Sequence, residues 1–363
     1  MQFIDLAAQQ ARIQPDLDAR IARVFEHRQF IMGPEVGKLE ARLAAFVDVE
    51  HCITVSSGTD ALQLALMALD IGPGDEVITT PFTFVATAET IRLVGATPVF
   101  VDIDPATYNL DPNAIEARVS DRTRAILPVG LFGQTPAMSA INAVAEHYAV
   151  PVIEDAAQSF GAWHAGRRSC GLSTLGVTSF FPAKPLGCYG DGGAVFTRDP
   201  ALAERLCCLR NHGQNRSYYY DCVGINARLD TIQAAVLLSK LTIFEDEIAE
   251  RQRVAARYDQ LLADTVQVPV IAEDGASVFS QYTVSVTERD QVAAALNDAA
   301  IPTAVYYPVP LNRQPPYLDS NPTPNADHAA ERVLSLPMHP YLAAADQNRV
   351  CEALRAALSQ SAA

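Results

Sequence analysis

A single lysine in an apolar, glycine-rich stretch is the first residue that could do chemistry. Residues 171–197 read GLSTLGVTSFFPAKPLGCYGDGGAVFT, and only Lys184 and Asp191 are charged in them, although charged residues make up 19% of the chain. A lysine in such surroundings loses hydration, which disfavours the ammonium form and frees the amine to act as a nucleophile or Schiff-base former. The alternative is a surface lysine whose stem packs on apolar neighbours, and that is the commoner outcome for this stretch taken alone.

Two further candidates stand at the ends of predicted strands. In Ser56-Ser57-Gly58-Thr59, small residues join a strand to a helix, so backbone N–H groups and hydroxyls can surround an anion at the positive end of that helix. A simple N-cap explains the same pattern equally well. Asp155 ends the apolar segment PVIED, where a buried carboxylate needs a cation or several donors. It could instead cap the next helix.

Other side chains could complete the same pocket. Gln158 follows Asp155 by three residues and would face the same side of a helical turn, and Ser179 lies five residues before Lys184. Phe82 or Phe84, between a strand and a helix, could stack on a planar ligand, although a lone aromatic there is more often core. A phosphate site, a carboxylate, a stacking face and a Schiff-base lysine are what pyridoxal phosphate requires.

The elements that must position these residues alternate between strand and helix. This alternation predicts an α/β fold with a mainly parallel sheet, covered on both faces, whose ligands bind at the carboxyl ends of the strands. The expected strands are 51–57, 76–79, 98–101, 124–129, 151–153 and 176–181, and the expected helices are 8–29, 35–46, 59–69, 111–119 and 138–148.

The second half of the chain reads differently. A long amphipathic pattern over 229–262 predicts one helix, or two in series, leading from a large domain (1–240) to a smaller C-terminal α/β domain (241–363). A helix over 289–299 and a final helix over 343–358 are expected in the smaller domain. Seven prolines in 302–324 exclude regular helix and favour an extended wall, in which Tyr306 and Tyr307 could line a pocket.

Charge and cysteine content narrow the function class. The formal net charge of -15 argues against a nucleic-acid-binding protein, although residues 209–228 are locally basic, with Arg210, His212, Arg216 and Arg228. This bias suggests an anionic substrate or a subunit contact, and a solvated loop is the alternative.

No apolar run reaches the about 18 residues of a membrane helix. The first residues lack signal-peptide character, and seven cysteines without metal-ligand spacing predict reduced thiols, a cytoplasmic location and no metal.

Several ordered motifs resemble one family. SSGTDAL, TFVATAET, PVIEDAAQSFGA, TSFFPAKPLGCYGDGGA, GINARLD and SLPMHP are similar to the motifs of the DegT-type nucleotide-sugar aminotransferases, which have the type I (aspartate aminotransferase) fold and use pyridoxal phosphate. The similarity covers nearly the whole chain. FIDL, AQSFGA followed by RSCGLST, and FFPAKPLGCYGDGGA most resemble the members that aminate UDP-2-acetamido-2-deoxy-3-oxo-glucuronate for bacterial lipopolysaccharide. The resemblance implies a homodimer with shared active sites and glutamate as amino donor.

The resemblance also implies residue roles. Lys184 would form the Schiff base and move protons, and Asp155 would keep the pyridine nitrogen protonated. The remaining cofactor contacts would come from Gln158 (ring hydroxyl), Phe84 (ring face), and Gly58, Thr59, Ser179 and a second subunit's Asn226 (phosphate). Arg228 and Tyr307 would meet the sugar, with Arg228 able to pair with a uronate carboxylate.

One position departs from the family pattern. A histidine is expected before the tyrosine of TAVYYP, where this chain has Tyr306, and this puts the exact sugar in question. Relatives that dehydrate sugars carry histidine in place of Lys184. The remaining alternatives are an aminotransferase for a 4-oxo nucleotide sugar and a non-catalytic regulatory protein on the same fold. A dinucleotide-dependent oxidoreductase would need a G-x-G-x-x-G fingerprint, which SSGTDAL does not supply.

Overall fold

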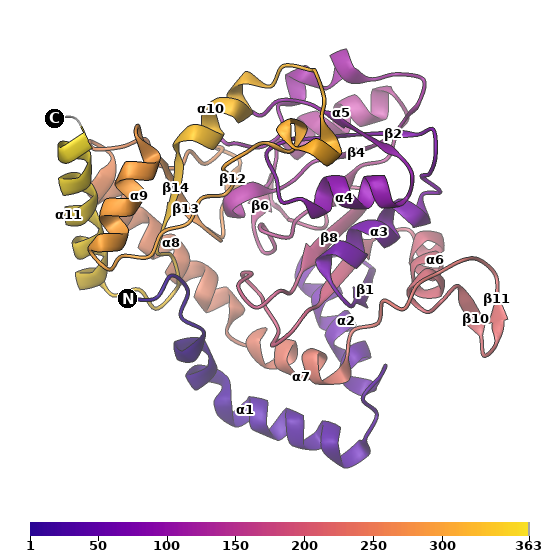
Figure 1. Cartoon of the computed structure of the whole chain (residues 1–363). Helices are drawn as coiled ribbons and strands as arrows, with labels where there is room; N and C mark the ends of the chain where they lie inside the picture. The colour runs from indigo at the N-terminus through magenta and orange to yellow at the C-terminus, as the bar shows by residue number, and fades with distance from the viewer. Residues whose placement is uncertain (362–363) are drawn as a thin grey trace.

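The computed structural model describes residues 1–361 and places a twisted sheet at the centre of the larger part of the molecule (Figure 1). One four-stranded sheet has the order β1-β9-β8-β5 and a three-stranded sheet has the order β3-β2-β4. Parallel bridges between Ile126 and Val152 and between Val129 and Asp155 join them into one layer. The strands are β1 (His51–Val55), β2 (Glu76–Thr79), β3 (Thr97–Phe100), β4 (Thr123–Leu127), β5 (Ile153–Asp155), β8 (Leu175–Ser179) and β9 (Gly193–Thr197).

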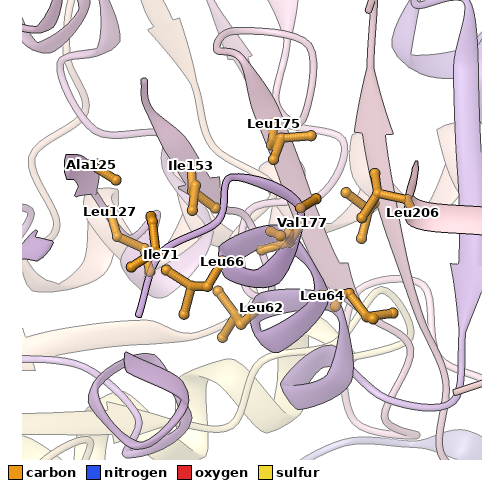
Figure 2. Packing of buried hydrophobic residues seen from close by; sticks show 14 of the residues in the cluster. Leu62, Leu64, Leu66, Ile71, Ala125, Leu127, Ile153, Leu175, Val177 and Leu206 are labelled. Atoms are coloured by element: carbon orange, nitrogen blue, oxygen red, sulfur yellow. The ribbon is translucent and has the colours of Figure 1, made fainter. Parts of the chain in front are cut away.

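The pairing confirms the predicted, mainly parallel sheet. β2 pairs in parallel with β3 and β4, and β5 pairs in parallel with β8, whereas β9 runs antiparallel to both β1 and β8. Alternate residues of the strands face opposite layers of helices, as the period of two requires. Leu127, Ile153 and Val177 pack against the α3 helix, as Figure 2 shows.

Helices cover both faces of this sheet. The helices of this part are α1 (Leu6–His27), α2 (Pro34–Val47), α3 (Gly58–Ala68), α4 (Ala86–Leu93), α5 (Met138–His147), α6 (Pro200–Arg210), α7 (Thr231–Lys240) and α8 (Phe244–Leu262). Of these, α1 packs on α7 and not on the sheet itself. The pattern over 229–262 is therefore two helices in series, one of the two alternatives expected. The opposite face of the sheet carries Ile78 and Ile126, which share a core with Ile141 of α5.

One predicted helix was wrong. Residues 111–119 form only two short 3-10 turns, η1 (Pro112–Ala114) and η2 (Glu116–Arg118). The Asp111 carboxylate accepts a hydrogen bond from the Asn113 N–H at 2.9 Å, so Asp111 caps the start of the first turn. Ile115 is the buried apolar side chain of this segment, so too little apolar surface is available to stabilise a longer helix.

The smaller C-terminal part has its own core. β13 (Tyr282–Ser285) pairs antiparallel with β14 (Val333–Leu336), and both pack with α8, α9 (Arg289–Asp298) and α11 (Ala344–Ser361). The chain boundary at 240/241 stays a prediction. Short strand pairs that the sequence did not reveal are β6 (Trp163–His164) with β7 (Arg167–Arg168) and β12 (Gly275–Ala276), and the hairpin of β10 (Gln214–Arg216) and β11 (Tyr219–Tyr220).

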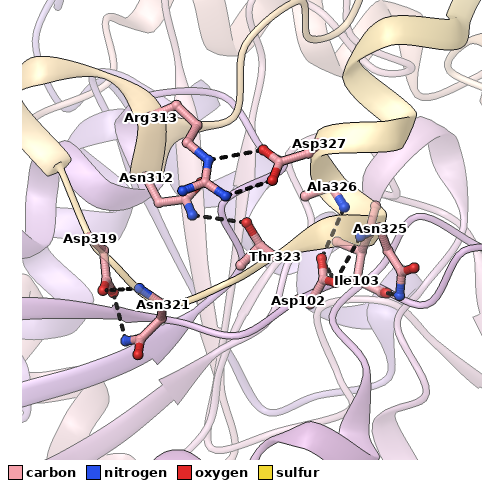
Figure 3. A network of polar contacts seen from close by, with 10 residues as sticks. All are labelled: Asp102, Ile103, Asn312, Arg313, Asp319, Asn321, Thr323, Asn325, Ala326 and Asp327. Atoms are coloured by element: carbon pink, nitrogen blue, oxygen red, sulfur yellow. Dashed lines mark hydrogen bonds and ion pairs between the residues drawn. The ribbon is translucent and has the colours of Figure 1, made fainter.

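The proline-rich segment lies over the carboxyl end of β3. As expected it holds no α-helix before its last residue, and contains only the 3-10 turns η4 (Leu311–Arg313) and η5 (Pro315–Tyr317). Its last residue, Pro324, opens α10 (Pro324–Arg332) at a position where proline is tolerated. The Asp102 carboxylate accepts from the Asn325 and Ala326 N–H groups, each at 2.9 Å, which fixes α10 to the sheet (Figure 3).

Candidate active site

Asp155 ends β5 as a buried carboxylate with few partners. Its side chain accepts from the Ala157 N–H at 3.1 Å and from the Thr87 hydroxyl at 3.0 Å. Burial raises the pKa of Asp155, while the Ala157 N–H, Thr87 and the charge of Lys184 act in the opposite direction. A cationic or N–H donor that reached this carboxylate would lower its pKa. Asp155 is therefore suited to hold a positively charged N–H group of a ligand.

Thr87 is a part of the site that sequence reasoning missed. Its hydroxyl lies 3.0 Å from the Thr83 hydroxyl as well as donating to Asp155, and both threonines are buried in the first turn of α4 and the loop before it. The two residues lie in TFVATAET, at a spacing of four. That spacing on one face of a helical turn was the available signal.

Lys184 lies on the loop that follows β8. A tight turn, in which the Lys184 N–H donates to the Phe181 carbonyl at 2.9 Å, places the residue close to the strand end. The side chain is partly buried, and desolvation lowers the pKa of Lys184, although the charge of Asp155 acts to raise it. The structure thus brings the predicted lysine and the predicted carboxylate to one edge of the sheet. More of the neutral amine is present near neutral pH than for an exposed lysine.

The small residues around Gly58 form a tight cradle at the start of α3. A Cβ atom added at Gly58 would lie 2.6 Å from the Ser179 Cβ, and one at Gly193 would lie 2.4 Å from the Ser57 carbonyl oxygen. Only glycine allows β8 and β9 to approach the helix terminus so closely. The Ser57 hydroxyl accepts from the Asp60 N–H at 3.0 Å, so Ser57 is the N-cap. The N-cap reading of this motif is therefore confirmed, and an anion site at Gly58, Thr59 and Ser179 stays a prediction.

Aromatic residues form a wall on the other side of Asp155. The Gln158 side chain donates to the Tyr307 hydroxyl at 3.2 Å and accepts from the Phe132 N–H at 3.3 Å. The ring of Phe84 lies 6.4 Å from that of Tyr307 and is 53% exposed, whereas Phe82 is fully buried. Of the two phenylalanines considered, Phe84 is therefore the one available to a ligand. Burial raises the pKa of Tyr307, so its phenol stays neutral and can donate.

Tyr306 belongs to the same aromatic group. Its ring lies 5.8 Å from that of Tyr307, and burial raises its pKa as well. The proline-rich segment therefore delivers Tyr307 to Gln158, with Tyr306 beside it. That the two tyrosines line a substrate pocket stays a prediction.

Asn226 and Arg228 stand apart from this group. The Arg228 guanidinium donates to the Asn226 side chain at 3.1 Å and to that of Asn211 at 3.2 Å. Within residues 1–361 no hydrogen bond or ion pair joins either side chain to Lys184, Asp155 or Tyr307 of the same chain. Of the basic group, Arg210 instead pairs with Glu40 at 2.6 Å inside the protein and is structural.

A model of the DegT/DnrJ/EryC1/StrS aminotransferase family matches residues 11–355, almost the whole chain. The chain belongs to this family. A UDP-2-acetamido-2-deoxy-3-oxo-D-glucuronate aminotransferase of Pseudomonas aeruginosa is 57% identical over 98% of this chain and 99% of its own. The fold agrees with solved structures of the family. A Brucella abortus member has a TM-score of 0.96, 45% identity and 99% coverage of both chains. The Streptomyces venezuelae DesV protein, solved with a ketimine intermediate, has a TM-score of 0.95, 41% identity and coverage of 98% and 97%.

The family assignment makes the chain a pyridoxal-phosphate-dependent nucleotide-sugar aminotransferase with the type I fold. The residues present fit the cofactor, because Gly58, Thr59 and Ser179 stand at the N-terminus of α3, where an anion is favoured, and the buried Asp155 carboxylate has only the Thr87 hydroxyl and the Ala157 N–H as hydrogen-bond donors among the described residues. Among the helices of residues 1–361, none combines the length and the apolar character needed to cross a membrane. In the same range, no three His, Cys, Asp or Glu side chains are grouped to hold a metal ion.

Proposed function

We propose that the enzyme transfers an amino group from glutamate to C3 of UDP-2-acetamido-2-deoxy-3-oxo-glucuronate. The observation that carries the substrate assignment is the 57% identity, over nearly the full length of both chains, to the Pseudomonas aeruginosa protein of that name. The motifs FIDL, RSCGLST and FFPAKPLGCYGDGGA support the same choice. The product would serve the synthesis of lipopolysaccharide sugars, and the reaction would take place in the cytoplasm.

Lys184 and Asp155 would be the catalytic residues. When bound, pyridoxal phosphate supplies an electron sink and a carrier for the amino group between the two substrates. The lowered pKa of Lys184 leaves its amine able to attack as a nucleophile and to take up and return a proton at the substrate carbon. Asp155 would accept a hydrogen bond from the protonated ring nitrogen, because its carboxylate is buried and has no cation in hydrogen-bond contact.

The surrounding residues would hold the cofactor. Gly58, Thr59 and Ser179 would bind the phosphate at the start of α3, where the helix terminus favours negative charge. Phe84 would stack on one face of the ring, since its side chain is exposed whereas that of Phe82 is buried. Gln158 would contact the ring hydroxyl while it stays bonded to Tyr307.

A second copy of the chain would complete the site. Asn226 would reach the phosphate of the partner's cofactor, and Arg228 would pair with the uronate carboxylate, beside Tyr307 and Tyr306. Two observations support a homodimer with shared sites. The side chains of Phe30, Ile31 and Met32 are each more than 40% exposed. Their segment is fixed to the start of α7, three residues after Arg228, because the Thr231 N–H donates to the Phe30 carbonyl at 2.9 Å.

The test is an amino-transfer assay with purified enzyme, glutamate and either the 3-oxo uronate or a 4-oxo nucleotide sugar, with products identified by mass spectrometry. We expect amination of the 3-oxo uronate and formation of 2-oxoglutarate. Turnover of only the 4-oxo sugar would overturn the substrate, and turnover of neither with any donor would favour a regulatory protein. Lys184→Ala should lose the visible absorbance of the loaded enzyme and at least about a thousandfold in rate, because no other amine replaces it.

A further inference from the structure

Two cysteines outside the proposed active site face each other across the base of the β10–β11 hairpin. The Sγ atoms of Cys208, at the end of α6, and Cys222, just after β11, are 3.9 Å apart. A disulfide has an S–S length of about 2.05 Å, so the two sulfurs need to approach by only about 2 Å to bond.

The backbone already holds the two residues in place. The Gly213 N–H donates to the Cys208 carbonyl at 2.9 Å, and the Asp221 N–H donates to the Gly213 carbonyl at 2.8 Å. A Cβ atom added at Gly213 would lie 1.8 Å from the Cys222 carbonyl oxygen, which shows how closely the strands meet here. Closure therefore asks for side-chain movement, with the ends of the loop already together.

The other thiols are placed differently. Cys52, Cys170, Cys188 and Cys351 are buried. Cys207 is exposed, but its sulfur contacts the Arg210 guanidinium at 3.9 Å, away from the hairpin. Cys222 is exposed and Cys208 is partly so. An oxidant in solution can therefore reach this pair, and Cys207 provides a matched control next to it in sequence.

We propose that Cys208 and Cys222 are a redox-responsive dithiol that reacts reversibly with low-molecular-weight disulfides of the glutathione type. The exposed Cys222 sulfur attacks the small disulfide, forming a mixed disulfide and releasing one small thiol. The Cys208 sulfur then attacks the Cys222 sulfur, forming the protein disulfide and releasing the second small thiol. The two protein thiols are oxidised, the small disulfide is reduced, and the two thiol protons end on the two small thiols.

The consequence is a clamp on the exposed hairpin. Tyr218 and Val223 are each 85% exposed, so few side-chain contacts fix this hairpin to the rest of the chain. A disulfide would close the loop of residues 208–222 covalently. In a reducing cytoplasm such a bond is transient and responds to the thiol pool. The proposal concerns these thiols alone and stands whether or not the proposed substrate is correct.

The experiment treats the purified full-length enzyme with oxidised glutathione, traps free thiols with N-ethylmaleimide and maps the peptides by mass spectrometry. We expect a Cys208–Cys222 link that reduced glutathione reverses, unchanged in Cys207→Ser and absent in Cys222→Ser. Free thiols at both positions, a stable glutathione adduct on Cys222, or a Cys207–Cys222 link would each overturn the proposal. Burial raises the pKa of Cys208, which leaves little of its thiolate near neutrality, so closure of the mixed disulfide should quicken as the pH rises.

A second readout avoids alkylation. Chymotrypsin cleaves after tyrosine, and Tyr218, Tyr219 and Tyr220 all lie between the two cysteines and are exposed. Oxidised enzyme that chymotrypsin has cut between Cys208 and Cys222 should run as one species on a non-reducing gel, because the disulfide joins the two fragments. After reduction it should run as two fragments. Two fragments without reductant would contradict the disulfide.

Discussion

The hydroxyl of Thr87 is the side-chain donor to the buried Asp155 carboxylate. Thr87→Val keeps the shape of the side chain but removes this donor, which leaves the buried carboxylate with the Ala157 N–H as its hydrogen-bond partner. Losing a hydrogen bond to a buried charged group costs about 1–3 kcal/mol, so we expect kcat to fall by about tenfold or more. Steady-state kinetics and the pH dependence of the visible spectrum of the loaded enzyme measure this. Thr87→Ser should restore both, and a Thr87→Val enzyme equal to wild type would exclude the role.

Glu154, next to Asp155 on the opposite face of β5, makes stability depend on pH. One carboxylate oxygen accepts from the Cys170 N–H at 3.0 Å and the other is buried without a partner. Burial raises the pKa of Glu154 from 4.5 to about 7. Because the folded pKa lies above the unfolded one, this contribution to stability is fully present below pH 4.5 and is lost as the pH rises through 7.

Glu154→Gln should remove that pH dependence. Relative to the variant, wild type should lose up to about 3 kcal/mol of unfolding free energy between pH 4.5 and pH 7, because each pKa unit is worth about 1.4 kcal/mol. Chemical denaturation of both proteins at several pH values gives the difference. A constant difference across this range would mean that Glu154 ionises normally in the folded protein.

At the scale of elements, the sheet and most of the candidate site could be predicted because both depend on local pattern. Apolar runs that end at Asp155 or within 176–181 indicate, to within about two residues, where strands stop, and parallel strands stop at one edge. Thr87 was missed because its spacing of four from Thr83 was the one available signal, and that spacing does not show which carboxylate the hydroxyl meets. The helix expected over 111–119 failed because Ile115 is its buried apolar side chain, which leaves too little apolar surface to stabilise a longer helix. The contact of Asp102 with α10 joins residues far apart in sequence, which spacing cannot reveal.

The Asp102 cap should matter for stability and for substrate binding. Asp102→Ala removes two hydrogen bonds to the first turn of α10, and the loss of such a cap costs about 0.5–2 kcal/mol. The same change loosens the segment that carries Tyr306 and Tyr307, so KM for the sugar should rise more than kcat falls. Asp111→Ala, which removes a local cap on an exposed turn, is the matched control. Equal unfolding free energies for the two variants would show that the cap does not stabilise the fold.

At the scale of the whole molecule, the separation of Asn226 from Lys184 within one chain is the feature that a homodimer would explain. Asn226→Asp preserves the contact to the Arg228 guanidinium but would place a carboxylate beside the phosphate, so it should weaken cofactor binding. Lys184→Ala removes the catalytic lysine, which the second subunit would contribute to the same site. If each site combines Lys184 of one subunit with Asn226 of the other, a mixed dimer keeps one site in which both residues are intact.

Unfolding and refolding the two variants together in equal amounts should therefore recover about one quarter of wild-type activity, since half of the dimers are mixed and each has one working site. The activity is read at a cofactor concentration too low to load Asn226→Asp alone. Size-exclusion chromatography confirms that the refolded protein is dimeric. A mixture no more active than the average of its two parents would mean that each chain builds its site from its own residues, and the exposed segment around Phe30 would then need another explanation.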